Sequence, residues 1–112
     1  MPEPLILPDI RRIDRSKIDG YLLHPINGRG KAAFFQAYGF VLVRWEELRD
    51  ALLDHAATGQ LQQVVASPYG RRYSVRGGLR TPSGREPQPV VCSVWQADND
   101  ADGVRLITAY PV

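Results

Sequence analysis

The chain has 112 residues, of which 44% are hydrophobic and 23% charged, and its formal net charge is +2. These values are typical of one globular domain with a modest core. Cys92 is the only cysteine, so no internal disulfide can form. No apolar run approaches the ~18 residues that would cross a bilayer. We therefore expect no membrane partner, and a start without a basic signal segment favours a cytoplasmic location.

The first half of the chain predicts helices. Residues 14–23 ("DRSKIDGYLL") carry apolar residues at helical spacing, and residues 24–30 form a loop rich in Pro, Asn and Gly. Residues 31–38 predict a short helix that Gly39 ends. Residues 44–58 ("RWEELRDALLDHAAT") give the strongest helical pattern, and Gly59 ends it.

From residue 61 the apolar pattern changes to that of strands. Four segments rich in Val, Ile, Tyr and Trp are separated by turn residues: 61–70, 71–79, 87–97 and 104–112. The order predicts a single α+β domain over residues 1–112, with a helical part at about 14–58 and a sheet part at about 61–112. We expect the N-terminal helices to pack on one face of a four-stranded antiparallel sheet, whose other face is open.

The strand pattern also predicts which side chains share a face. Alternation places Tyr73 with Val75, and it places Val104 and Leu106 with Thr108 and Tyr110 on one face of the last strand, which we expect to be central. The predicted core includes Phe34, Trp45, Leu48, Leu52, Val91 and Leu106.

Five arginines lie between residues 71 and 85 with no acidic residue among them. A cationic block of this kind suits a polyanion such as RNA, although a solvated hairpin surface explains it equally well. The candidate nucleic-acid-binding residues on the open face are Arg71, Arg72, Tyr73, Arg76 and Arg80. Tyr110 and Trp95 add two rings on which bases can stack.

The stretch "HPINGRGK", residues 24–31, invites comparison with a phosphate-binding P-loop. That interpretation fails, because Pro25 and Ala32 stand where the motif needs Gly and Ser or Thr. Backbone N–H groups at a helix start, with Lys31 beside them, still suit one phosphate of a larger ligand. Alternatively, the glycines only shape the turn.

Other chemistry is poorly represented. Two histidines and one cysteine give no metal-ligand spacing, and no G-x-S-x-G motif occurs, so we expect no metal and no cofactor. The remaining His, Lys, Arg, Thr and Tyr suit metal-independent RNA cleavage. His24 can act as acid or base and Arg85 or Arg80 can hold the phosphate, whereas the simpler interpretation makes His24 a capping or core residue and Tyr110 a packing residue.

The runs "GKAAFF", "YGRRYSV" and "TAYP" resemble a small uncharacterised bacterial family, a domain of unknown function, from about Leu5 to Pro111. More broadly, helices followed by a four-stranded sheet that ends in T-x-Y are similar to the barnase, EndoU, colicin and RelE-like toxin ribonucleases. That resemblance implies a catalytic set of His24, Lys31, Arg85, Thr108 and Tyr110. EndoU-like members use two histidines, and here His55 lies inside the long helix.

Two functions follow. The first is a metal-independent, toxin-type ribonuclease that acts on RNA. The alternative is a non-enzymatic binding module, such as an antitoxin, immunity or phage-borne protein, which uses the arginine-rich face to bind RNA or a small cognate protein. An enzyme requires His24, Lys31 and a sheet arginine to converge on one concave pocket, whereas a binding module requires only a flat patch.

Overall fold

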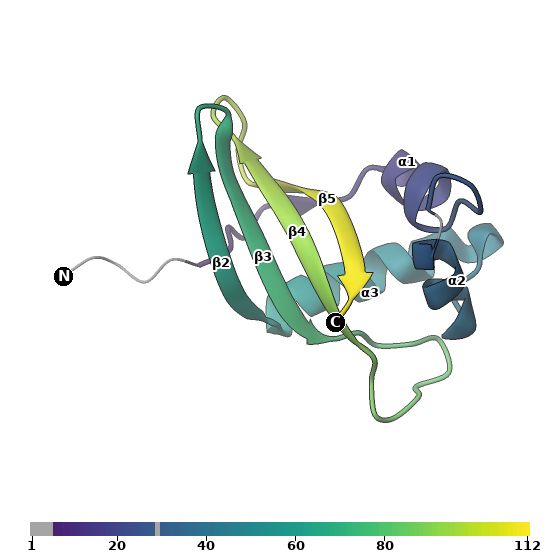
Figure 1. Ribbon diagram of the computed structural model, residues 1–112. Coiled ribbons are helices and arrows are strands. Elements are labelled where there is room, and N and C mark those ends of the chain that lie inside the picture. Colours follow the sequence, from purple (N-terminus) through teal and green to yellow (C-terminus); the bar gives the residue numbers. More distant parts are fainter. Residues whose placement is uncertain (1–5, 29) are drawn as a thin grey trace.

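The computed structural model describes residues 6–28 and 30–112. A two-residue strand at Arg11–Arg12 comes first. The helical elements follow it and precede the four longer strands, as the sequence predicts (Figure 1). They are α1 (Arg15–Lys17), which continues into the π-helical turn η1 (Ile18–Leu22), then α2 (Gly30–Ala37), the 3₁₀ turn η2 (Leu42–Arg44) and α3 (Trp45–Thr58). Four longer strands follow the helices, and the α+β class is confirmed.

The strands form one five-stranded mixed sheet in the order β1-β5-β4-β3-β2. Its members are β1 (Arg11–Arg12), β2 (Gln60–Ser67), β3 (Gly70–Gly78), β4 (Val90–Asp98) and β5 (Val104–Pro111). The strands β2 to β5 are antiparallel neighbours, as predicted. The prediction of a four-stranded antiparallel sheet is wrong in one respect, because β1 adds a fifth strand parallel to β5. A two-residue strand is too short to show a period in the sequence.

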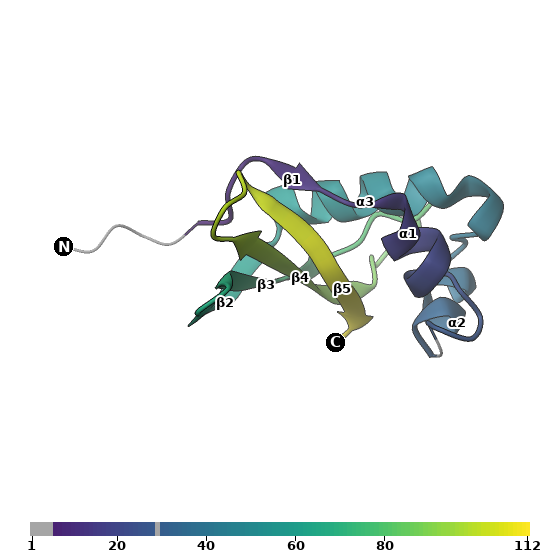
Figure 2. The ribbon, with the colours of Figure 1, turned by 90° about the horizontal axis from the view of Figure 1, so that it is seen from above.

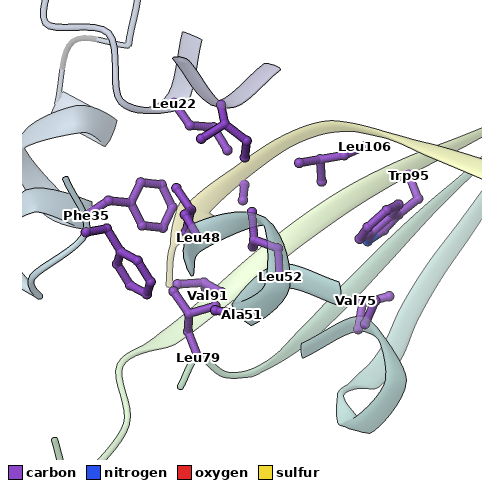
Figure 3. Close-up of a cluster of buried hydrophobic side chains, with 14 of the residues drawn as sticks. Leu22, Phe35, Leu48, Ala51, Leu52, Val75, Leu79, Val91, Trp95 and Leu106 are labelled. Atoms are coloured by element: carbon purple, nitrogen blue, oxygen red, sulfur yellow. The ribbon is translucent and has the colours of Figure 1, made fainter. Parts of the chain in front are cut away.

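The helix α3 crosses one face of the sheet and closes the core (Figure 2). Leu48 and Leu52 of α3 pack with Val91 and Leu106 of the sheet, and all four are buried as predicted (Figure 3). Phe34 and Trp45 are only partly buried and pack against the margin of this core.

The end of α2 shows how the local sequence fixes the helical part. Gly39 has a φ of 97° and donates to the carbonyl of Gln36 at 3.0 Å, and Phe40 donates to the carbonyl of Phe35 at 3.1 Å. These bonds form a Schellman motif, in which glycine takes the left-handed position without strain. The Phe35 and Phe40 rings add the accompanying apolar contact, 6.3 Å between centroids. Gly39 therefore ends the helix as predicted.

An irregularity in β5 changes which of its side chains face the core. Trp95 pairs with Leu106 but Val94 pairs with Thr108, so Ile107 is an extra residue in β5. Such a bulge shifts the alternation by one position. Leu106 and Ala109 consequently both face the core, and Thr108 lies on the opposite face with Tyr110. The prediction that Thr108 and Tyr110 share a face is confirmed, but Val104 and Leu106 are not on that face.

Candidate functional site

The face of the sheet opposite α3, which we call the open face, is organised in cross-strand rows. Strand register and alternation define three of them: Arg76–Cys92–Tyr110, Ser74–Val94–Thr108 and Arg72–Gln96–Arg105. Successive positions on one face of a strand are about 7 Å apart, so the rows are regularly spaced. The middle members, Cys92, Val94 and Gln96 of β4, are buried, so the accessible groups come from β3 and β5. The surface combines cationic groups, neutral hydrogen-bonding groups and one aromatic ring.

The row with Arg72 borders a groove of about 440 Å³ near the β2–β3 turn. Arg72 Nε donates to Gln96 Oε1 at 3.2 Å, and Arg105 Nε donates to Asp98 Oδ2 at 2.9 Å. The Arg105 hydrogen bond lowers the pKa of Asp98 and locally neutralises Arg105. Within the part of the chain that the structure describes, neither Arg72 nor Arg76 forms an ion pair with a carboxylate. Both charges are therefore available to an anion.

A second cationic group lies beside the C-terminal half of β5, where α1 and α2 gather (Figure 2). The Tyr21 hydroxyl is 3.2 Å from Thr108 Oγ1. Lys17 Nζ lies 5.4 Å and Lys31 Nζ 5.6 Å from the centroid of the Tyr21 ring. The hydrogen bond with Thr108, followed by the proximity of Lys31, lowers the pKa of Tyr21. We call Lys17, Tyr21, Lys31 and Thr108 the Tyr21 cluster.

The Tyr21 cluster contains two predicted site residues, Lys31 and Thr108, and two that sequence reasoning missed. Lys17 and Tyr21 are four residues apart in a helical segment, which places them on one face of that segment. Their proximity could therefore have been predicted from the sequence. The contact of Tyr21 with Thr108 could not be predicted from the sequence, because it depends on how η1 packs beside β5. Thr108 also belongs to the open face, so the cluster and the arginine rows adjoin.

His24 has a structural role in this conformation. Its Nδ1 accepts hydrogen bonds from the backbone N–H groups of Ile26, at 3.2 Å, and Asn27, at 3.0 Å. A ring nitrogen that accepts two bonds carries no proton. The capping interpretation of His24 is therefore confirmed, and no described contact joins His24 to Lys31 or to a sheet arginine.

The glycine-rich loop is shaped by close packing. A Cβ at Gly28 would lie 2.2 Å from the carbonyl oxygen of Tyr21, so only glycine fits there. The Lys31 N–H already donates to the Gly28 carbonyl at 2.9 Å and is not free for a phosphate. Among the described residues of this segment, the side chain of Lys31 therefore remains as a candidate anion-binding group.

The arginine block of residues 71–85 does not lie together on the open face. Alternation places Arg71 on the same face as Tyr73, opposite Arg72. The chain leaves the sheet at Gly78, so Arg80 and Arg85 belong to the β3–β4 loop. The prediction of one arginine face is wrong for these three residues.

The two loop arginines have their own surroundings. The Arg85 guanidinium lies 4.9 Å from the centroid of the Tyr38 ring. Arg80 lines a groove of about 530 Å³ that also contains Glu47 and Asp50. Acidic groups beside Arg80 make this groove a poor match for a polyanion.

The aromatic residues are divided between the buried core and the exposed surface. Tyr73 is 5% exposed and Trp95 is 0% exposed, because both face the core, so neither ring is available to stack on a base. Tyr110 is 40% exposed, and Cys92 beside it raises its pKa. Tyr69, in the β2–β3 turn, is 80% exposed and was missed as a candidate.

His55 lies on the core side of the sheet, away from the open face. It is 1% exposed, and its Nδ1 and Nε2 each lie 3.3 Å from a backbone carbonyl oxygen, of Gly78 and Val75 respectively. Burial lowers its pKa, so the ring is neutral near pH 7. His55 is therefore not placed to act as a second catalytic histidine on the open face.

The described residues hold no group of three His, Cys, Asp or Glu side chains that could bind a metal ion. Over the same ranges, the structure has no helix with the length and hydrophobicity needed to cross a membrane.

Comparison with known proteins gives one match. The family described as a domain of unknown function, DUF6883, matches residues 6–112. No curated protein and no solved structure matches the chain, so the resemblance to toxin ribonucleases gains no support. The chain belongs to the DUF6883 family.

Proposed function

We propose that the protein is a binding module whose open face holds single-stranded RNA through its phosphates. The observation that carries this proposal is the pair of adjoining cationic groups on one side of the molecule. Arg72 and Arg76 project from β3 and pair with no carboxylate of residues 6–28 or 30–112, and Lys17 and Lys31 lie beside β5. Between them lie the hydroxyl groups of Thr108 and Tyr110.

The chemistry of this surface suits a phosphodiester chain. Arginine binds phosphate oxygens through two parallel N–H bonds, and lysine acts as a compact positive charge. Tyr110 and Tyr69 are the exposed rings near these cations, and base stacking on such rings is tolerant of sequence. Rows of cations with interspersed aromatic rings are typical of proteins that follow a single strand without reading its bases.

Binding without cleavage is supported by the position of His24. The ribonuclease hypothesis requires His24, Lys31 and a sheet arginine to converge, but among the described residues the contacts of the His24 side chain are to backbone N–H groups of its own turn. The β3–β4 loop also places Arg85 against Tyr38. The geometry therefore favours the binding module of the two functions.

The Tyr21 cluster keeps a toxin-type ribonuclease as the second candidate. A Tyr21 phenolate would take the proton of a ribose 2′-OH, the 2′-oxygen would bond to phosphorus, and the P–O5′ bond would break. The Lys31 ammonium would give its proton to the leaving 5′-oxygen. The observation in favour is the lowered pKa of Tyr21 beside Lys31.

One experiment separates these proposals. A fluorescein-labelled single-stranded RNA is titrated in EDTA at 50 and 200 mM KCl, and binding is followed by anisotropy. With three phosphate contacts, the affinity should fall about twentyfold between the two salt concentrations. Absent or salt-independent binding would refute the electrostatic proposal. A gel of the same samples should show intact RNA, and cleavage that is lost in Tyr21→Phe would establish the second candidate instead.

A further inference from the structure

The two edges of the sheet differ in length and charge. The β1 edge has two residues, and both are arginines. The β2 edge has eight residues, with the sequence QLQQVVAS, and contains neither a charged residue nor proline. In residues 6–28 and 30–112, β2 pairs with β3 alone, so its outer side has no strand beside it (Figure 1).

An edge strand presents a row of unpaired N–H and C=O groups, which is a template for another strand. Proteins usually protect such edges by making them short, by placing charges or proline on them, or by a bulge. The β1 edge is protected by its shortness and its arginines. The β2 edge has one irregularity, between Leu61 and Gln63, and from Gln63 to Ser67 its pairing with β3 is regular. Val65, in this regular part, is 49% exposed.

We infer that β2 pairs with β2 of a second copy of this chain, antiparallel and about a two-fold axis. The neutrality of the strand argues for a copy of itself, because antiparallel apposition brings no like charges together. Two-fold pairing is isologous and uses the β2 edge of both copies. The protected β1 edges prevent further strands from adding, so the assembly stops at a dimer.

The dimer also has a geometric consequence for the open face. It joins two sheets into one continuous sheet, in which the two β3 strands are three strand spacings apart, or about 14 Å. Arg72 and Arg76 of both copies then flank the junction on one continuous face. The inference does not depend on RNA binding, because it rests on the strand edge alone.

The test is the mass of the protein in solution, measured by sedimentation equilibrium over a range of concentrations. The wild-type chain should show twice the chain mass. The double variant Gln62→Lys and Gln63→Lys should raise the dissociation constant of the dimer at least about tenfold, because like charges then meet across the axis. The matched control, Gln36→Lys and Gln88→Lys, adds the same charge at exposed positions away from β2 and should remain dimeric.

A charge-reversal pair gives a second measurement. The variant with Gln62→Glu and Gln63→Glu should also raise the dissociation constant at least about tenfold on its own, and an equimolar mixture with the Lys variant should restore the wild-type affinity as a heterodimer. Far-ultraviolet circular dichroism checks that each variant is folded. A wild-type chain that stays monomeric at 200 µM overturns the inference. A Lys variant that is folded and dimerises like the wild type overturns it as well, because the contact then lies elsewhere.

Discussion

The hydroxyl groups of Tyr21 and Thr108 lie 3.2 Å apart, although the two residues are 87 positions apart in the chain. This contact attaches the first helical segment to the C-terminal half of the last strand. It also places Lys17 and Lys31, which lie against the Tyr21 ring, next to the open face.

Replacement of Thr108 by valine should raise the pKa of Tyr21 toward its ordinary value of 10.0, because the hydrogen bond with Thr108 is the largest cause of the lowered pKa. The loss of one such bond should cost about 1 kcal/mol of stability. The measurement is an NMR titration with tyrosine labelled at Cζ. Thr58→Val, which removes an exposed hydroxyl from α3, is the control and should leave Tyr21 unchanged. An unchanged Tyr21 pKa in Thr108→Val would show that the contact is absent in solution.

The loop before α2 offers a matched pair of glycines. Gly28→Ala should lower the free energy of unfolding by about 1–3 kcal/mol, because the new Cβ would lie 2.2 Å from the Tyr21 carbonyl oxygen. Gly30→Ala meets no atom within 4 Å and should be neutral or stabilising by about 0.4–1 kcal/mol. Urea denaturation measures both. Equal stability of the two variants would contradict the close packing of Gly28 in this loop.

His55 should make the stability dependent on pH. Its pKa is lowered in the folded state, so below the ordinary value of 6.5 the unfolded chain binds the proton more readily. The contribution of His55 is therefore fully present above about pH 6.5 and is lost as the pH falls toward the folded pKa. Urea denaturation between pH 7.5 and 5 should show this decline.

In His55→Leu the decline over that pH range should be weaker, even though the variant is less stable overall. Asp98 does not interfere, because its pKa is lowered from an ordinary 3.8 and its effect on stability appears at more acidic pH. A variant with the same slope as the wild type would assign the pH dependence to another group.

The elements that were predictable from the sequence are those with strong local signals. Gly39 fits a Schellman motif and Gly59 ends α3, so both helix ends follow from residue type. Alternation correctly placed Tyr73 and Val75 on one face of β3, but that face is the core and not the open face on which Tyr73 was predicted to bind RNA. Within the described chain, long periodic segments thus specified their own structure.

The features that were missed depend on contacts between distant segments. The strand β1 exists only because Arg11 and Arg12 lie along β5, and two residues carry no period. The bulge at Ile107 shifts the alternation of side chains along β5 by one position. No glycine or proline next to Ile107 indicates this bulge in the sequence. For the site, the sequence pointed to Lys31 and Thr108 but not to Tyr21. The contact between Tyr21 and Thr108 depends on how η1 packs beside β5 and not on their spacing in the sequence.

The central claim is that RNA binds the open face, and the adjacent residues Arg71 and Arg72 test it most directly. They are both exposed, they carry the same charge, and they project to opposite faces of β3. Arg72→Gln should weaken binding of single-stranded RNA at least about fivefold and reduce the salt slope, whereas Arg71→Gln should stay within about twofold of the wild type. An equal loss of affinity in both variants, or a larger loss in Arg71→Gln, would contradict the assignment of the RNA site to this face.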